Sequence, residues 1–180
     1  MPFLIQTKRL TLRPLAATDF PFVRSLHLNE RMLSHSGGGP LRTEEQSITG
    51  FQYCLEIEKV EPRLGSWIVE LKPQQLPIGS LILRRPATKN PIEGLEIGYS
   101  LLPEFWGLGL AQESARAMVD YARKEFGPVR MVALINPVNE ASRNVLVKTG
   151  FISCGTTEYV DPSTGEVKHT EVLEIPAPNP

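Results

Sequence analysis

Residues 95–115, LEIGYSLLPEFWGLGLAQESA, decide the fold, because they predict a strand, a tight turn and the start of a helix in direct succession. Gly107 and Gly109 let the backbone of the turn come close to a ligand and direct its N–H groups inward. The helix that begins there offers unpaired N–H donors and the positive end of its dipole. This stretch therefore predicts a binding site for a phosphate group.

Two other phosphate-binding motifs do not fit these residues. A Walker-type loop needs Lys-Ser or Lys-Thr after its glycines, and neither Gly107-Leu108-Gly109 nor Gly37-Gly38-Gly39 is followed by such a pair. A dinucleotide-binding turn needs a third small residue and an acidic residue about 20 positions further on. Here the turn comes past the middle of the chain, and Asp120 falls too early and inside the predicted helix.

The residues before this stretch predict one strand and two helices. Residues 10–13 alternate as in a half-buried strand, which the following proline ends. Thr18-Asp19 can cap the first helix, and Thr43-Glu44-Glu45-Gln46 is a capping box for the second. Between the two helices, residues 34–40 (SHSGGGP) predict a mobile loop. The buried stripes expected on the helices are Phe20, Val23 and Leu26, and then Ile48, Phe51 and Leu55.

The other predicted strands are residues 67–71 and 78–83 as a hairpin, and 129–135, 151–160 and 167–175. Asn139 caps a short helix that ends at Gly150. The residues expected to face inward are Ala111, Ala115, Met118, Val119 and Ala122 on the helix after the glycine turn, and Ala141, Val145, Leu146 and Thr149 on the short helix. This order predicts one α/β domain on a mixed sheet over residues 1–175, with a disordered tail at 176–180.

Composition excludes several classes of function. The chain has 180 residues and a formal net charge of −1, so no overall basic field indicates nucleic-acid or membrane binding. No apolar run reaches membrane-spanning length, and the N-terminus shows no signal peptide. Cys54 and Cys154 give neither a disulfide framework nor the spacing of a metal site. We therefore expect a cytoplasmic protein without a metal.

The motifs around the glycine turn resemble those of the GNAT superfamily of N-acetyltransferases. The acetyl-CoA signature of that superfamily is Gln/Arg-x-x-Gly-x-Gly/Ala, and residues 106–111 fit it with Trp106 in the first place. That departure costs little, because the signature works mainly through backbone N–H groups. Residues 96–113, 137–151 and the opening 7–14 resemble the Rim-type branch, the ribosomal-protein N-terminal acetyltransferases. The resemblance covers about residues 7 to 175.

This resemblance implies a single α/β (α+β) domain whose mixed, mostly antiparallel and twisted sheet has about seven strands and is flanked by about four helices. Acetyl-CoA would lie in a cleft where the sheet splays between residues 96–101 and 129–135. Its pantetheine arm would bond free backbone groups around Leu101 and Leu102 like an added strand, and its pyrophosphate would meet the N–H groups of residues 108–112. Asn139 would hold the arm from the other side. The implied cofactor-binding residues are Leu101, Leu102, Trp106, Gly107, Leu108, Gly109, Leu110, Ala111, Gln112 and Asn139.

Two residues are candidates for the chemistry. Glu96 is the candidate general base, acting through water, although it could equally be a solvated strand residue or pair with Arg13 or Arg84. Many superfamily members protonate the thiolate with a tyrosine. In this sequence Leu146 stands at that position, so the tyrosine is absent. In the Rim-type branch a serine three residues after the asparagine can serve instead, which points to Ser142. That hydroxyl could also simply bond its own helix backbone.

The function expected from the sequence is acetyl-CoA-dependent N-acetylation of a primary amine, by direct attack in a ternary complex. The acceptor is either a protein N-terminal α-amine or a small amine, and it would be selected by residues 28–50, the loop at 84–94 and the final hairpin. The alternative is a non-catalytic acyl-CoA-binding or sensor module on the same fold, which the missing tyrosine keeps open. A homodimer is compatible with either function.

Overall fold

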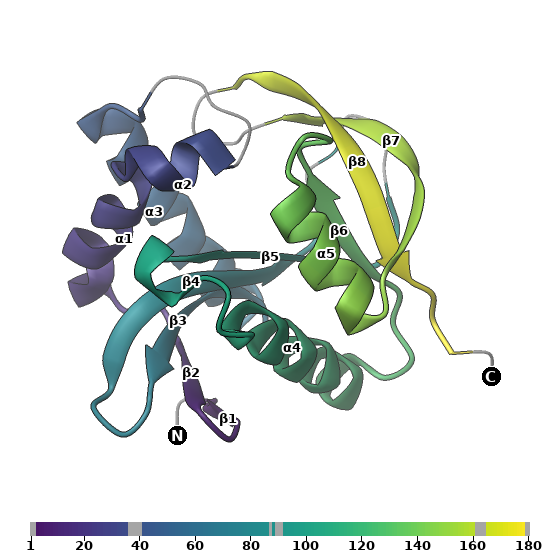
Figure 1. Cartoon of the computed structure of the whole chain (residues 1–180), viewed down its shortest axis with the longest axis horizontal. Helices are drawn as coiled ribbons and strands as arrows, with labels where there is room; N and C mark the ends of the chain where they lie inside the picture. Colours follow the sequence, from purple (N-terminus) through teal and green to yellow (C-terminus); the bar gives the residue numbers. More distant parts are fainter. Residues whose placement is uncertain (1–2, 36–40, 87, 89–91, 161–164, 179–180) are drawn as a thin grey trace.

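The computed structural model describes residues 3–35, 41–86, 88, 92–160 and 165–178, and these residues form an open sheet with helices on both faces (Figure 1). The eight strands described lie in the spatial order β1-β2-β3-β4-β5-β6-β8-β7. They are β1 (Ile5–Gln6), β2 (Leu10–Pro14), β3 (Gly65–Leu71), β4 (Leu76–Arg84), β5 (Leu95–Leu101), β6 (Met131–Ile135), β7 (Ile152–Val160) and β8 (Val167–Ile175).

Five α-helices and two 3₁₀ turns are described. They are η1 (Ala17–Asp19), α1 (Phe20–His27), α2 (Glu30–His35), α3 (Glu44–Val60), η2 (Pro103–Phe105), α4 (Leu110–Phe126) and α5 (Glu140–Thr149). The main core packs α4 against one face of the sheet, with Met118 and Ala122 fully buried. A smaller core packs α1 and α3 around Ile68 on the other face. None of the described helices is long and apolar enough to cross a membrane.

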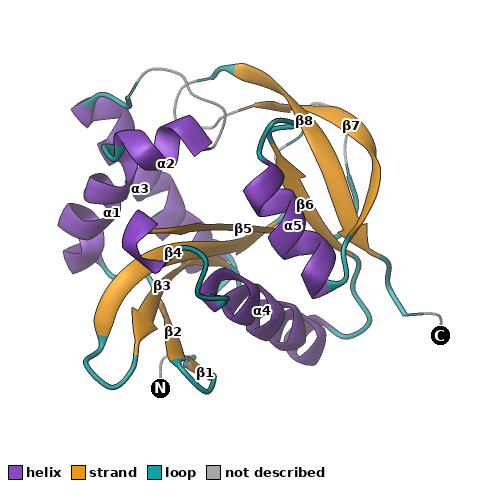
Figure 2. Cartoon of the chain, in the orientation of Figure 1, coloured by secondary structure: helices purple, strands orange, loops and turns teal. Residues whose placement is uncertain are grey.

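The sheet opens between β5 and β6. This parallel pair has only two residue pairs, Leu95 with Met131 and Glu96 with Val132. On either side the antiparallel pairing continues, since β4 pairs with β5 from Glu96 to Leu101 and β6 pairs with β8 along its whole length. Beyond the shared end the two strands point in different directions (Figure 2). The splayed sheet implied by the resemblance is therefore present.

Most local signals are confirmed by the structure. The Thr43 side chain accepts a hydrogen bond from the Gln46 N–H, and the Gln46 side-chain oxygen accepts one from the Thr43 N–H, so the capping box forms at the start of α3. Asn139 caps α5, and Gly150 ends it in the left-handed conformation with φ of 104°. These caps could be predicted from the sequence, because a helix cap involves only residues that are close together in the chain.

Three expectations about the elements were wrong. Ser34 and His35 belong to α2 rather than to a loop, while the rest of that predicted loop lies outside the described residues. Ile48 is 39% exposed, because α3 turns Ser47, Gly50 and Phe51 inward instead. Ala141 is exposed on α5. The fold class is confirmed, and the eight strands and five α-helices among the described residues are close to the expected counts of about seven and about four; β1 and α2 are too short to show a periodic pattern.

Two further expectations fall partly on residues that are not described. The turn between the final strands includes residues 161–164, and the expected tail includes residues 179 and 180, and both groups lie outside the described part of the chain.

Candidate functional site

A cleft of about 660 Å³ lies at the opening of the sheet. Residues from α1, α2, β4, β5, the glycine turn and the N-terminal turn of α4 line it, together with α5 on the other side. Tyr99 and Ser100 both line it, although successive residues of a strand point to opposite faces of the sheet. The cleft therefore passes through the opening and connects the two faces.

The free edge of β5 offers backbone groups to this cleft. The Leu95 N–H donates to the Arg130 carbonyl at 2.9 Å across this edge, and the N–H and C=O of every second residue point the same way. Tyr99 and Leu101 therefore face the opening, where β6 no longer pairs with β5. The Leu101 carbonyl accepts a hydrogen bond of 2.7 Å from the Trp106 indole N–H, so Trp106 is fixed at the end of the strand.

Leu102 does not present free backbone groups, contrary to the expectation from the sequence. Its N–H donates to the Ile78 carbonyl at 2.8 Å, and its carbonyl accepts from the Phe105 N–H at 2.9 Å. Leu102 is also absent from the residues that line the cleft. The reason is the alternation along the strand: the even-numbered residues of β5 point their N–H and C=O groups toward β4, and the N–H of Leu102, directly after β5, continues this pattern.

The glycine turn has the geometry of an anion site. Gly107 and Gly109 have φ of 74° and 73°, a left-handed conformation that side chains other than glycine resist. Gly109 is the N-cap of α4 without a side-chain cap, and the Glu113 N–H is the first to bond within the helix, to the Gly109 carbonyl at 3.1 Å. The N–H groups of Leu110, Ala111 and Gln112 are thus left for a ligand, and all three residues line the cleft.

Leu108 lies outside the cleft. The residue is 56% exposed, and its carbonyl accepts a hydrogen bond of 2.8 Å from the Arg9 guanidinium. The Glu113 carboxylate accepts from the Thr7 hydroxyl at 2.6 Å, the Arg9 N–H at 2.9 Å and Arg9 Nε at 2.6 Å. Burial raises the pKa of Glu113, but the hydrogen bonds from Thr7 and Arg9 outweigh it and hold the pKa below its ordinary value.

We call this arrangement of Thr7, Arg9 and Glu113 the clamp. It turns the negative charge of Glu113 away from the anion site and ties the glycine turn to the β1–β2 corner. Sequence reasoning missed it, because the residues are more than 100 positions apart. The available signal was the acidic Glu113 in the first turn of a helix whose N-terminus is predicted to bind phosphate. Its negative charge would be unfavourable beside a phosphate, so it needs a cation as a partner.

On the other side of the cleft, the N-cap and the first turn of α5 supply two of the predicted residues. Asn139 Oδ1 accepts from the Ser142 N–H at 3.0 Å, and both residues line the cleft. The Ser142 hydroxyl lies 3.0 Å from the Tyr99 hydroxyl, and the latter also donates to the Ser142 carbonyl at 3.1 Å. Burial raises the pKa of Tyr99 to about 12, despite the hydrogen bond with Ser142 that lowers it. Tyr99 is thus a protonated phenol in the cleft.

Glu96 makes a buried ion pair with Arg84. Its two oxygens accept from Arg84 Nε at 3.1 Å and Nη2 at 3.0 Å, and the Arg84 guanidinium also donates to the Tyr159 hydroxyl at 3.1 Å. Burial lowers the pKa of Arg84, but the charge and hydrogen bonds of Glu96 outweigh it and hold the pKa above its ordinary value. Glu96 does not line the cleft. The structure therefore contains the Arg84 pairing that the sequence offered as an alternative to a base.

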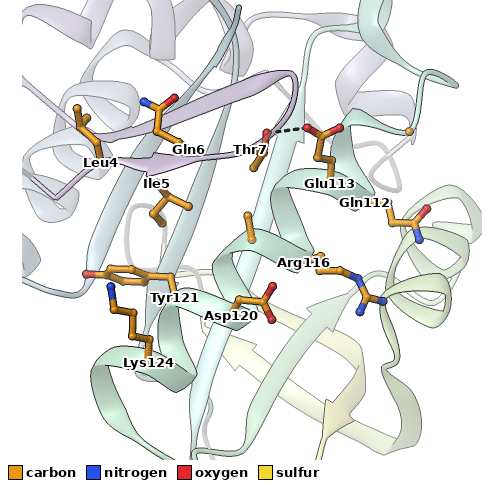
Figure 3. Close-up of a pocket in the computed structure, with 12 residues that line it drawn as sticks. Leu4, Ile5, Gln6, Thr7, Gln112, Glu113, Arg116, Asp120, Tyr121 and Lys124 are labelled. Atoms are coloured by element: carbon orange, nitrogen blue, oxygen red, sulfur yellow. Dashed lines mark hydrogen bonds between the residues drawn. The ribbon is translucent and has the colours of Figure 1, made fainter.

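A second cavity, of about 650 Å³, lies between β1 and the outer side of α4 (Figure 3). Its lining mixes acidic and basic side chains, with Arg116 and Lys124 beside Asp120. The Thr7–Glu113 hydrogen bond of the clamp crosses its edge in Figure 3. None of the motifs found in the sequence points to this cavity. Within the described residues, no group of three His, Cys, Asp or Glu side chains could hold a metal ion.

Comparisons with known proteins agree with this geometry. A family model described as "Acetyltransferase (GNAT) domain" matches residues 9–152. The Aspergillus fumigatus protein named FsC-acetyl coenzyme A-N(2)-transacetylase is 29% identical over 181 residues, which cover 94% of this chain and 76% of that protein. The crystal structure of an acetyltransferase from Agrobacterium tumefaciens superposes with a TM-score of 0.78 at 26% identity, and covers 97% of this chain and 95% of that one.

Structural neighbours include Rim-type ribosomal-protein acetyltransferases. RimL, a ribosomal α-N-protein acetyltransferase solved in complex with coenzyme A, has a TM-score of 0.73 at 18% identity and covers 96% of this chain and 97% of that one, which shows a shared fold. The match to the family model extends over far more than half of the chain. The protein therefore belongs to the GNAT acetyltransferase family.

Proposed function

We propose that this protein transfers the acetyl group of acetyl-CoA to a primary amine by direct attack in a ternary complex. The observation that carries the proposal is the cleft at the opening of the sheet, which has free strand edge on one side and uncapped helix N–H groups at its end. An extended arm that ends in a pyrophosphate has the shape and charge that these two features bind. Acetyl-CoA has both parts.

The donor would lie along β5. In this arrangement the pantetheine arm bonds the backbone of Tyr99 and Leu101 like an added strand, and the pyrophosphate accepts from the N–H groups of Leu110, Ala111 and Gln112. Two observations support this arrangement. The odd-numbered residues of β5 point their backbone groups toward the opening, and no side chain caps the N-terminus of α4. Asn139 lies across the cleft at the N-cap of α5, and its side-chain NH₂ remains a donor while its oxygen caps the helix.

Ser142 is proposed as the proton donor to the leaving group. The amine nitrogen attacks the thioester carbonyl, the C–S bond breaks, and the thiolate takes the proton of the Ser142 hydroxyl. The proton that the amine loses goes to water, and solvent returns one to Ser142. The Tyr99 phenol has a single proton, which lies within reach of both the Ser142 carbonyl, at 3.1 Å, and Ser142 Oγ, at 3.0 Å. When that proton is donated to Oγ, it would turn the serine proton toward the sulfur and stabilise the oxygen once the serine proton has left.

The amine itself needs little help from a base if it is an α-amine. Its pKa of about 7.7–8.0 leaves a large neutral fraction near neutral pH, whereas a lysine side chain at about 10.4 is almost wholly protonated. Two relatives have names that agree with such an acceptor, the N(2)-transacetylase and the α-N-protein acetyltransferase. Since Glu96 is bonded to Arg84, we propose that water rather than Glu96 receives the proton.

The first test is a thermal melt with acetyl-CoA, followed by a thiol-release assay over a panel of amines. At 100 times the dissociation constant, binding adds about 2.7 kcal/mol to the free energy of unfolding, which raises the melting temperature by about 5–10 °C. The absence of any shift at millimolar acetyl-CoA would contradict the donor site. A shift without thiol release for any amine or peptide would favour the acyl-CoA sensor instead.

The roles of Ser142 and Tyr99 predict a specific kinetic pattern. Ser142→Ala should lower kcat by about 100-fold and Tyr99→Phe by about 10-fold, because a positioned acid contributes about 10²–10⁴. The double variant should be little worse than Ser142→Ala, since the two groups act as a unit. The affinity for acetyl-CoA should change by less than about twofold, which a thermal melt measures.

Ser114→Ala is the matched control for this series. Its hydroxyl bonds the Ala111 carbonyl within a helix at 2.9 Å, the structural role that the sequence also allowed for Ser142, and Ser114 does not line the cleft. Its kcat should stay at the wild-type level. If Ser142→Ala matched that control, Ser142 would be a structural residue.

A further inference from the structure

The glycine turn and the start of α4 form a wall between the cleft and the second cavity. Gly109 and Gln112 line both of them, whereas Glu113, the next residue of α4, lines only the second cavity (Figure 3). Among the described residues that line the cleft there is no Asp or Glu. A carboxylate thus stands directly behind the N–H groups that are proposed to hold the pyrophosphate.

The charge of Glu113 would oppose such a ligand. Although burial raises the pKa of Glu113, the hydrogen bonds from Thr7 and Arg9 hold that pKa below its ordinary value, so the carboxylate is ionised near neutral pH. A negative charge in the first turn of a helix interacts with the same dipole that a bound anion uses, and it repels that anion. Tight binding of a pyrophosphate therefore needs a cation beside Glu113.

Arg9 supplies this cation and also contacts the turn itself. Its Nε donates to the Glu113 carboxylate at 2.6 Å, and its Nη1 donates to the Leu108 carbonyl at 2.8 Å. A Cβ placed on Gly109 would lie 3.6 Å from Arg9 Nη2, so the guanidinium lies against the turn. Arg9 lines neither cavity, and it can reach the contents of the cleft only through the turn.

The bond to Leu108 also orients the next N–H group. The C=O and the N–H of a planar trans peptide point in opposite directions. Because Arg9 holds the Leu108 carbonyl on its own side, the Gly109 N–H points away from Arg9. Gly109 lines the cleft, so this N–H can join the donors at the start of α4.

We propose that Arg9 is a positioning residue for the donor, which sets the affinity for acetyl-CoA from outside the cleft. It neutralises Glu113, and it fixes the peptide between Leu108 and Gly109. This inference rests on the proposed binding of acetyl-CoA at the glycine turn. Since the pyrophosphate and the thioester are at opposite ends of the pantetheine arm, Arg9 acts on the binding of the donor and not on the transfer of its acetyl group.

Arg9→Ala separates these two effects. Isothermal titration should show an affinity for acetyl-CoA that is lower by at least about 10-fold, the combined effect of one lost charge and one released peptide. The KM for acetyl-CoA should rise by the same factor, while kcat at saturation stays within about twofold of the wild type. A merely structural loss would lower kcat by reducing the folded fraction, and would leave KM unchanged.

Arg130→Ala is the matched control. Arg130 Nε donates to the Glu174 carboxylate at 2.6 Å, and the side chains of this pair are 35% and 18% exposed, against 43% and 19% for Arg9 and Glu113. Neither residue of the control pair lines the cleft. Its affinity for acetyl-CoA should stay within about twofold of the wild type.

Glu113→Gln tests whether charge is the reason. Its amide oxygen can still accept from Thr7 and from the Arg9 N–H, but the negative charge is gone. We expect this variant to bind acetyl-CoA about threefold more tightly than the wild type, because Arg9 then acts on the donor without an opposing charge. Adding Glu113→Gln to Arg9→Ala should recover at least about threefold in affinity. A purely structural ion pair would instead weaken binding alike when either partner is changed.

The outcomes separate this inference from the proposed function. If the wild type binds acetyl-CoA and Arg9→Ala binds it equally well, or no worse than Arg130→Ala, the inference is overturned and the donor site stands. The same follows if Glu113→Gln weakens binding as much as Arg9→Ala does. A wild-type protein that does not bind acetyl-CoA at all would contradict the proposed function, and this inference with it.

Discussion

Gly109→Val is expected to lower the affinity for acetyl-CoA by at least about 100-fold. A β-branched side chain resists φ of 73°, so the turn must rearrange and the N–H groups of Leu110, Ala111 and Gln112 lose their common direction. Hydrogen bonds to a charged group contribute about 1.5–3 kcal/mol each, and the loss of two of them accounts for a factor of this size. Isothermal titration with acetyl-CoA measures the change directly.

The control for this variant is Gly165→Val. Gly165 also has a left-handed φ, of 70°, and a Cβ there would meet no atom within 4 Å, but it lies before β8 and away from the cleft. The strain at the two positions is comparable, so a loss of stability alone would appear in both variants. If the two bound acetyl-CoA equally well, the pyrophosphate could not lie on the turn before α4.

Glu96→Ala is expected to lower the free energy of unfolding by about 3–5 kcal/mol, because it leaves the Arg84 guanidinium buried without its carboxylate. Both side chains of this ion pair are at most 10% exposed, so water can do little to compensate. The double variant Arg84→Met with Glu96→Leu should recover most of the loss, since apolar residues of similar size often replace a buried ion pair without cost. Urea unfolding at pH 7 measures all three proteins.

The same double variant also decides the catalytic role of Glu96. If the ion pair is only structural, the stable double variant should keep kcat within about 10-fold of the wild type. A loss of 100-fold or more in a folded protein would make Glu96 the general base after all. The two roles are separable because the apolar pair restores stability without restoring a proton acceptor.

Local patterns predicted the parts of the site that depend on neighbouring residues. The strand, the glycine turn, the start of α4 and the cap at Asn139 were all readable, because each is decided within a few positions of the chain. The absence of a side-chain cap at the start of α4 is equally local, because glycine at position 109 has no side chain that could cap the helix. The elements that line the cleft could therefore be predicted from the sequence, and the donor site proposed there uses them.

What depends on pairing between distant elements could not be predicted in the same way. The alternatives left open for Glu96 were Arg13 and Arg84, and only the register of β4 against β5 selects Arg84. Arg13 bonds Glu70 and Asp19 instead. The error at Leu102 has the same origin, because the side toward which its backbone points follows from the hydrogen bond to Ile78 on β4. The partnership of Tyr99 with Ser142 likewise needs α5 to be placed on β5.

The clamp has a consequence for how the protein folds. Its hydrogen bonds join residues 104 and 106 positions apart, so a polypeptide emerging from the ribosome cannot form them until the first turn of α4 has been made. Closing so long a loop carries an entropic cost that only later contacts repay, and contacts of this kind slow folding. The turn that is proposed to hold the cofactor would thus be fixed late in folding, after the hairpin of β3 and β4 has had time to pair.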